Sequence, residues 1–210
     1  LLVASWAPTT AFAQNTIVQP TNIQASSQAG MFSRGADQVI NGDGLASPLA
    51  TGDPVPGTFP THTGTASGNM WTSALSGDPG FPDPDGFLRF DLGGTFSISE
   101  LHFWGKDSGA SVKDVEISFS TTAIDSGYGT AESFTFTEPP SRPFDVQTIT
   151  FSSTQTAQFV ELDILSNHDD LDSTTVGEVR FTAVPEPASF ALIGGFLALG
   201  AVMLRRRRNS

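Results

Sequence analysis

The aspartates of two short clusters are the residues of this sequence best suited to bind a cation. Each cluster has three carboxylates in a turn-rich stretch: Asp78, Asp83 and Asp85 in "DPGFPDPDG", and Asp169, Asp170 and Asp172 in "NHDDLDS". Ca²⁺ prefers such oxygen ligands. Neither cluster has the D-x-[DN]-x-[DN]-G spacing with a distal glutamate that marks a calcium loop. We therefore favour solubilising acidic loops, with calcium loops as the alternative.

Catalytic motifs are absent from the sequence. There is no cysteine, no G-x-S-x-G, no H-E-x-x-H and no phosphate-binding loop. His62, His102 and His168 are far apart in the sequence, so a metal site made of all three is not expected. We therefore predict a protein that is not an enzyme, with a secreted hydrolase as the least favoured alternative.

Aromatic side chains are the candidates for carbohydrate binding, because sugars present apolar C–H faces that rings can cover. The available rings include Phe59, Phe81, Trp71, Trp104 and Tyr128. Trp71, within "NMWTS", is expected in the core. Trp104 ends a predicted strand just before Gly105, so we predict that it lies at a rim and contacts a ligand. The alternative is that Trp104 only packs.

Composition points to a β-rich secreted protein. The net charge is -12, charged residues make up only 15%, and the chain has 21 glycines and 14 prolines. Four of the ten basic residues stand together near the C-terminus, so the rest of the chain is more acidic still. Phosphates would be repelled by it, and we expect no nucleic-acid partner.

Apolar residues in the central part of the chain alternate with polar ones, as expected of strands with one buried face. "GFLRFDLGG" places Leu88, Phe90 and Leu92 on one face. Similar segments are "ISELHFWG", "VKDVEISFS", "ESFTFTE", "VQTITFS" and "QFVELDIL", with Phe159, Leu162 and Ile164 predicted inward in the last. Six to eight strands predict one all-β antiparallel sandwich over residues 14–184.

Residues 41–86 interrupt this pattern. They contain nine glycines and seven prolines, and proline lacks the amide donor that a central strand needs. A loop of this length in a compact domain is unusual and often functional.

The N-terminal end of the chain has the character of a processing segment. Ala11-Phe12-Ala13 matches the small-x-small pattern of signal peptidase sites. We therefore predict that residues 1–13 are a truncated signal peptide. The alternative is a disordered or strand-forming N-terminus.

The C-terminal end has a similar character. Ala188 to Leu204 is an uncharged run of 17 residues, about 25 Å long as a helix. We predict a transmembrane helix over 188–204. By the positive-inside rule, the residues that stop it on the cytoplasmic side would be Arg205, Arg206, Arg207 and Arg208. The alternative is a buried C-terminal helix with a basic tail.

Val184-Pro185-Glu186-Pro187, followed by the apolar run and the arginines, resembles the PEP-CTERM sorting signal of Gram-negative bacteria. The resemblance covers residues 185–210 with the preceding valine. It implies export across the inner membrane and a transient membrane anchor. An exosortase would then cut near the Pro-Glu-Pro motif and release the protein to the cell surface or the extracellular matrix.

The body resembles a second family, the discoidin or coagulation-factor C-type domains, which are galactose-binding-like jelly rolls. The landmarks, in order, are "ASSQAG", "ADQVINGDG", "NMWTS", "FLRFDLGGTFSISELHFWG", "VKDVEISFST" and "AQFVELDILSN" followed by "VGEVRF". The resemblance spans residues 22–181 and implies an antiparallel sandwich that binds ligands with loops at one end. Asn41-Gly42 departs from the usual Asp-Gly, and Trp71 follows much later than is usual.

This resemblance also implies one structural calcium ion. Its ligands would be Asn41, Asp43 and Glu178, with Gly42 allowing a tight turn. Asparagine in place of aspartate removes one negative charge and should weaken the site. The alternative is an Asn-Gly turn with solvent-facing acids.

Taken together, these patterns predict an exported module that binds polysaccharide or another matrix component. The main alternative is a structural acidic matrix protein that binds no specific glycan.

Overall fold

Nine strands and one 3-10 helix occur in the part of the chain that the computed structural model describes, namely residues 14–29, 35–63, 68–75, 83, 85–106, 109–169 and 172–185. They are β1 (Thr16–Val18), β2 (Asn22–Ala25), η1 (Ala36–Val39), β3 (Trp71–Thr72), β4 (Phe87–Trp104), β5 (Asp114–Ser120), β6 (Glu132–Thr135), β7 (Gln147–Ile164), β8 (Thr175–Val176) and β9 (Glu178–Ala183). The strands of the main sheet pair in antiparallel fashion, which confirms the all-β prediction.

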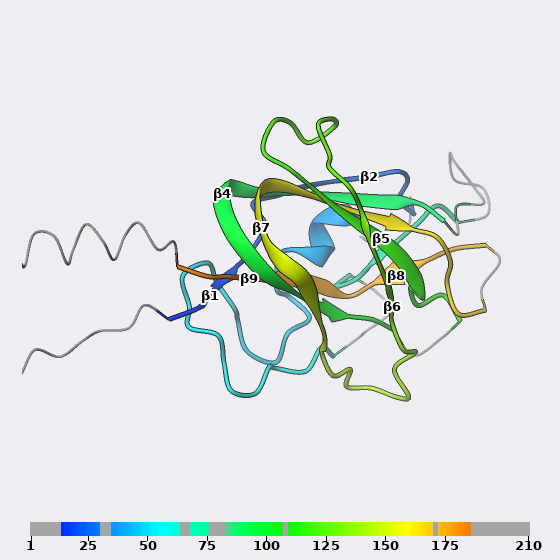
Figure 1. Cartoon of the computed structure of the whole chain (residues 1–210). Helices are drawn as coiled ribbons and strands as arrows, with labels where there is room; N and C mark the ends of the chain where they lie inside the picture. Colours follow the sequence, from blue (N-terminus) through cyan, green and yellow to red (C-terminus); the bar gives the residue numbers. More distant parts are fainter. Residues whose placement is uncertain are drawn as a thin grey trace, which may run out of the picture.

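Strands β4 and β7 are each long enough to belong to both layers of the sandwich (Figure 1). The first part of β4 pairs with β2, and its last part pairs with β9. Between these parts the register with β7 shifts, and Gly93 takes a positive φ of 77°. Glycine adopts this angle without steric cost, so β4 can bend there. One layer therefore holds β2, β5 and β6, and the other holds β1 and β9.

Two expectations about these strands were wrong. "FLRFDLGG" and "ISELHFWG" were predicted as separate strands, but both belong to β4 because the glycine pair bends the strand without ending it. "VQTITFS" and "QFVELDIL" likewise form the single strand β7. Phe159 is buried, as predicted, but it pairs with Asp91 and lies on the opposite face of β7 from Leu162 and Ile164. One residue of register decides the face.

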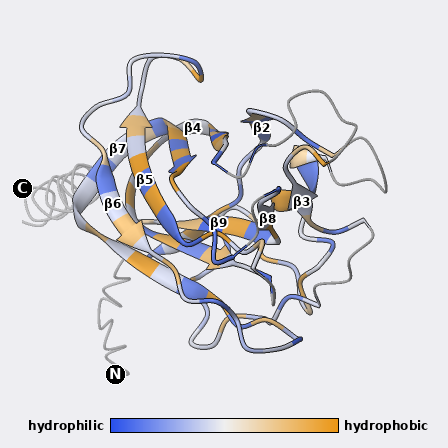
Figure 2. Cartoon of the chain, turned by 90° about the vertical axis from the view of Figure 1, so that its right-hand side faces the viewer, coloured by the Kyte–Doolittle hydropathy of each residue, from blue (hydrophilic) through white to orange (hydrophobic). Residues whose placement is uncertain are grey.

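The main core lies between the two layers. Leu88, Phe90 and Leu92 belong to it, as predicted. Aromatic rings join the layers: Phe90 meets Phe181 edge to face at 5.7 Å, and Phe103 stacks on Phe136 at 4.1 Å. Figure 2 shows the same alternation as hydrophobic and hydrophilic bands along β4 and β5.

Residues 42–62, here called the covering segment, fold back across the outer face of β9 and the last part of β4 (Figure 1). Leu49 and Phe59 from this segment pack around Trp104 and Ile17. As a result all six residues of β9 are buried, because this strand has the main core on one side and the covering segment on the other. A strand with two covered faces is unusual in an antiparallel sheet.

The two ends of the sandwich differ. At one end, Thr16 pairs with Ala183, so β1 begins where β9 ends. The other end, here called the loop end, carries the segments that follow β2, β4, β6 and β7. These segments are tied together by backbone hydrogen bonds: Ala29 N–H to Thr72 O, Ser73 N–H to Thr174 O, Thr175 N–H to Ala110 O and His168 N–H to Ser111 O, all between 2.7 and 3.0 Å. The loop end is therefore a connected platform.

Several predicted features lie outside the described residues, so the structure leaves them as predictions. They are the signal peptide 1–13, the transmembrane helix 188–204, Glu186 and Pro187 of the sorting motif, and the membrane-stop residues Arg205, Arg206, Arg207 and Arg208. Within the described ranges, no helix is sufficiently long and apolar to cross a membrane.

The fit of the covering segment can be tested at Gly44. A Cβ added there would lie 1.8 Å from Nε2 of His62, which is fully buried and cannot move aside. We expect Gly44→Ala to lower the free energy of unfolding by about 1–3 kcal/mol, as overpacked sites do. Gly57→Ala is the matched control, because no atom lies within 4 Å of the added methyl group. Equal stability of the two variants in urea denaturation would contradict the described packing.

Candidate functional site

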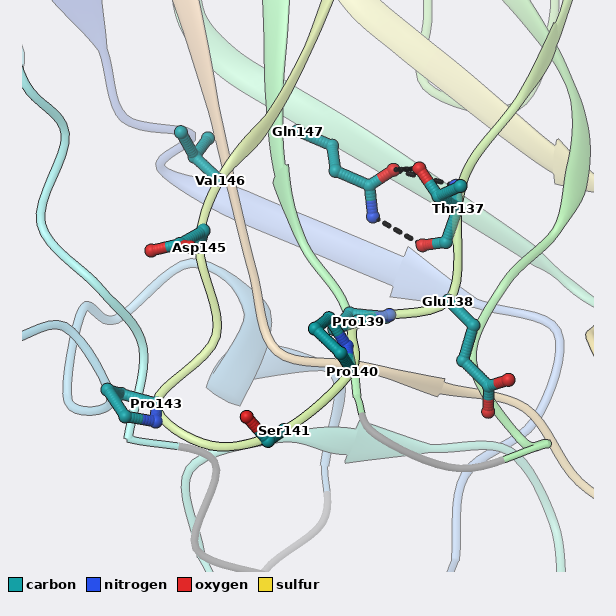
Figure 3. Close-up of a pocket in the computed structure, with 9 residues that line it drawn as sticks. All are labelled: Thr137, Glu138, Pro139, Pro140, Ser141, Pro143, Asp145, Val146 and Gln147. Carbon is teal, nitrogen blue, oxygen red and sulfur yellow. Dashed lines mark hydrogen bonds between the residues drawn. The ribbon is translucent and has the colours of Figure 1, made fainter.

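A cavity of about 350 Å³ lies at the loop end, along the segment that connects β6 to β7 (Figure 3). Its walls come from one proline-rich stretch: Thr137, Glu138, Pro139, Pro140, Ser141, Pro143, Asp145, Val146 and Gln147. The volume is within the range of small-ligand sites. Because proline lacks an amide hydrogen, this stretch cannot pair as a strand of the sheet, and it forms a surface loop instead. Residues 137–147 are called the cavity loop below.

The cavity loop is closed at its base by one side chain. Oε1 of Gln147 accepts hydrogen bonds from the backbone N–H and the hydroxyl of Thr137 at 2.7 and 2.8 Å. Nε2 of Gln147 donates to the Thr137 carbonyl at 2.6 Å. Figure 3 shows this pair at the open ends of the loop. Gln147 thus replaces the strand pairing that prolines would not allow.

Two further contacts hold the loop against the body. Phe144 is fully buried and exchanges two backbone hydrogen bonds of 2.8 Å with His62 of the covering segment. Pro139 is buried close to Gly105, where a Cβ would lie 3.2 Å from its ring. The cavity therefore sits on a fixed loop, which lowers the entropy cost of binding a ligand.

The chemistry of the cavity is amphipathic. Pro140 and Pro143 contribute exposed apolar rings, while Asp145, Glu138 and Ser141 contribute exposed oxygen atoms. In Figure 3 the two carboxylates project to opposite sides of the proline rings. Such a surface suits a ligand with apolar C–H faces and many hydroxyl donors.

Trp104 does not lie at a rim, so its predicted ligand contact is corrected. The side chain is fully buried, its ring lies 6.1 Å from that of Phe59, and its indole N–H donates to the Pro60 carbonyl at 2.9 Å. The covering segment has closed over the face on which Trp104 projects. Trp71 is buried in the main core, as predicted, and its indole N–H donates to the Ser27 carbonyl.

The residues predicted to bind calcium are brought together only in part. Oε2 of Glu178 accepts a hydrogen bond of 3.0 Å from the Gly42 N–H, so the loop and the strand do meet. Asn41 and Asp43 are exposed, and Oδ1 of Asn41 accepts from the Asp43 N–H at 2.9 Å. The other Glu178 oxygen, Oε1, accepts from the Arg180 guanidinium.

This arrangement does not fit a calcium ion. Ca²⁺ needs six to eight oxygen ligands with free lone pairs. Here Glu178 is fully buried and both of its oxygens face N–H donors. Burial raises the pKa of Glu178, and Arg180 and the Gly42 N–H oppose that rise by favouring the carboxylate. Among the described residues, no three acidic or histidine side chains are grouped so as to hold a metal.

One described member of the acidic clusters, Asp83, has a structural role at the loop end. Oδ2 of Asp83 accepts from the Ser26 hydroxyl at 2.8 Å and from the Ser27 hydroxyl. This ties two segments of the loop end together. The backbone N–H of Asp169 donates to the Gly109 carbonyl, while its side chain is exposed, as is that of Asp85. Asp78 and Asp170 lie outside the described residues.

Two of the three histidines are buried: His62 belongs to the covering segment, and His102 lies beneath it. His102 is fully buried, and its ring nitrogens contact the hydroxyls of Thr148 and Thr182 at 3.0 and 2.7 Å. Phe59 covers this ring at 4.2 Å. Burial lowers the pKa of both His62 and His102 to about 4. His168 lies elsewhere, at the loop end.

Sequence reasoning missed two features: the cavity loop and Arg180. The run "TEPPSRPFDVQ" signals a loop by its prolines, but nothing in it separates a ligand cavity from a simple connection. Arg180 lies in the alternating strand "EVRFTA" at a position that would face solvent in an uncovered sheet. A burial prediction would have required the path of the covering segment.

Comparison with solved structures identifies the fold. No protein-family model matches the sequence, and a search of curated proteins finds no match. A family 32 carbohydrate-binding module of NanJ from Clostridium perfringens, solved with galactose, superposes with a TM-score of 0.54 at 16% identity, covering 80% of this chain and 98% of that module.

Two more structures agree. A family 32 module from another Clostridium perfringens protein, in complex with GalNAc-β-1,3-galactose, gives a TM-score of 0.53 at 13% identity, covering 78% of this chain and 94% of that one. The C-terminal domain of a chitobiase from Bacteroides fragilis gives 0.54 at 14% identity, covering 80% and 97%. The chain therefore has the galactose-binding-like sandwich fold of these modules, which confirms the fold expected from the second resemblance.

The buried histidines predict acid sensitivity. With pKa values of about 4 in the folded protein and 6.5 as the ordinary value, both rings stay neutral while the unfolded chain takes up protons below pH 6.5. The two histidines should therefore lower stability from pH 7 to pH 5 by about 2 kcal/mol each, while Glu178, whose pKa burial raises, contributes in the opposite direction. Urea unfolding at the two pH values measures this loss. His102→Gln should remove the contribution of that ring, about 2 kcal/mol, whereas the control Gly57→Ala, whose added methyl group meets no atom within 4 Å, should leave the pH dependence unchanged. The same pH dependence in the wild type and in His102→Gln would contradict the prediction.

Proposed function

We propose that this protein is a carbohydrate-binding module without catalytic activity of its own. The observation that carries the proposal is the proline-walled cavity on the fixed β6–β7 loop, at the loop end of a sandwich like those of carbohydrate-binding modules. The sandwich supplies a rigid base, and the cavity supplies apolar rings beside oxygen acceptors.

The charge of the site narrows the ligand class. Glu138 and Asp145 flank the proline rings, and the whole chain has a net charge of -12. Arg142 is exposed in the same loop, so the local charge is weakly negative, and uronic acids and sulfated sugars should bind less well than neutral sugars. Neutral sugars, whose hydroxyls donate to carboxylates, suit the cavity better. The similar modules were solved with galactose and with GalNAc-β-1,3-galactose, so these two sugars are natural first probes.

Binding to a glycan array tests the proposal. We expect the purified chain to bind a subset of neutral glycans, and Asp145→Ala to weaken that binding by about tenfold, the effect of losing one charged hydrogen bond. Asp125→Ala is the matched control, because it removes an equally exposed carboxylate from the β5–β6 connection, away from the cavity. An array without any bound glycan would argue for the structural matrix protein instead. Unchanged binding by Asp145→Ala would move the site away from this cavity.

We also propose that the module is exported and released by an exosortase. The support is the order of Val184-Pro185-Glu186-Pro187, the apolar run and the four arginines. The fold is compatible with a cut beyond this point. The Val184 N–H makes the last sheet-like hydrogen bond, 2.8 Å to the Ser97 carbonyl, and Pro185 is half-exposed. Removal of the following residues would thus leave every described strand in place.

Mass spectrometry of the protein recovered from the surface of its native Gram-negative cell tests this second proposal. We expect a mature chain that begins at Gln14 and ends near residues 185–187. A change of Pro185-Glu186-Pro187 to alanines should leave the tail attached and the protein in the membrane fraction. Surface protein that still carries Arg205 to Arg208 would contradict the proposal.

A further inference from the structure

Arg180 is the buried cation that joins β9 to the covering segment. Its side chain is 1% exposed. Nε donates to the Leu49 carbonyl at 3.0 Å, and Nη1 donates to the Val179 carbonyl at 2.8 Å and to Oε1 of Glu178. A Cβ placed on Gly42 would lie 3.2 Å from Nη2. The guanidinium therefore lies between the start of the covering segment, its Leu49 carbonyl and the Glu178 carboxylate.

We infer that Arg180 replaces the structural calcium ion that the sequence resemblance led us to expect. A buried carboxylate is stable only beside a cation or several donors. Arg180 supplies both, because a guanidinium carries a fixed positive charge and several N–H donors in one plane. The guanidinium donates hydrogen bonds to the Glu178 carboxylate and to the Leu49 carbonyl. A bound calcium ion would coordinate such oxygen atoms directly.

The same contacts leave no place for calcium beside Arg180. Two cations at this distance repel each other strongly in a protein interior. Glu178 carries the one buried negative charge in the cluster, and Arg180 already balances it. Asn41 is neutral where the resemblance led us to expect aspartate, so the turn adds no second buried charge. Arg180 and Asn41 thus act together: the arginine supplies the positive charge that calcium would supply, and the asparagine removes a negative charge that calcium would need.

The consequence is a covering segment held by a side chain instead of an ion. The protein should fold, and keep this segment in place, in surroundings without calcium. This inference concerns the fold and is independent of the proposed glycan binding.

Thermal unfolding of the wild-type chain in excess EDTA and in millimolar CaCl₂ is the first test. We expect the same Tm in both buffers. A structural ion would stabilise the folded state by mass action. A rise in Tm of about 5 °C or more with calcium, lost in Glu178→Gln, would therefore overturn the inference.

Variants at Arg180 are the second test. Arg180→Met leaves Glu178 buried without its cation, and we expect Tm to fall by about 10 °C. Arg180→Met combined with Glu178→Leu should recover most of this loss, because the unpaired charge is removed as well. Arg89→Met is the control: it breaks a more exposed ion pair, with Glu161, and the contact of the guanidinium with the Phe87 ring, so Tm should fall by about 4 °C or less.

An Arg180→Met variant with the Tm of the wild type would overturn the inference. Loss of folding in that variant would agree with it, and the calcium titration of the wild-type chain would then remain the measurement able to refute it.

Discussion

A strand face that is closed off from water must find all of its hydrogen bonds inside the protein, and this constraint governs the side of the sandwich formed by β9 and the last part of β4. Polar residues project from these strands as they would toward solvent, and the covering segment then lies on them. The polar side chains on this face form hydrogen bonds with partners inside the protein. His102 contacts two threonine hydroxyls, Trp104 donates to Pro60, and Arg180 connects Glu178 with Leu49.

The candidate site lies at the loop end, next to the covered side of the sandwich. Around the loop end, connections that are distant in sequence bond to one another, as Ala29 does with Thr72 and Ser73 with Thr174. The cavity loop belongs to this end and is fixed to the covering segment through Phe144 and His62. Residues 42–62 of the long insertion therefore help to hold the cavity loop in place.

Sequence patterns predicted the parts of this fold that depend on near neighbours. Alternation placed Leu88, Phe90 and Leu92 inside, and the motif around Trp71 predicted its burial. The errors arose where a distant segment decides the outcome. Trp104 and Arg180 face outward on their strands, and only the path of residues 42–62 buries them. Gly93 marks a bend within a strand, although glycine pairs more often mark a turn between two strands.

The position of β9 has a mechanical consequence. It lies in the middle of a layer, between β1 and β4, and its last residue is at the end opposite the candidate glycan site. A load carried from a bound ligand to the end of β9 would run along the strand. Because interstrand hydrogen bonds lie across the strand direction, such a load is shared among all of them at once. Strands pulled in this shearing geometry resist force better than strands that are unzipped bond by bond.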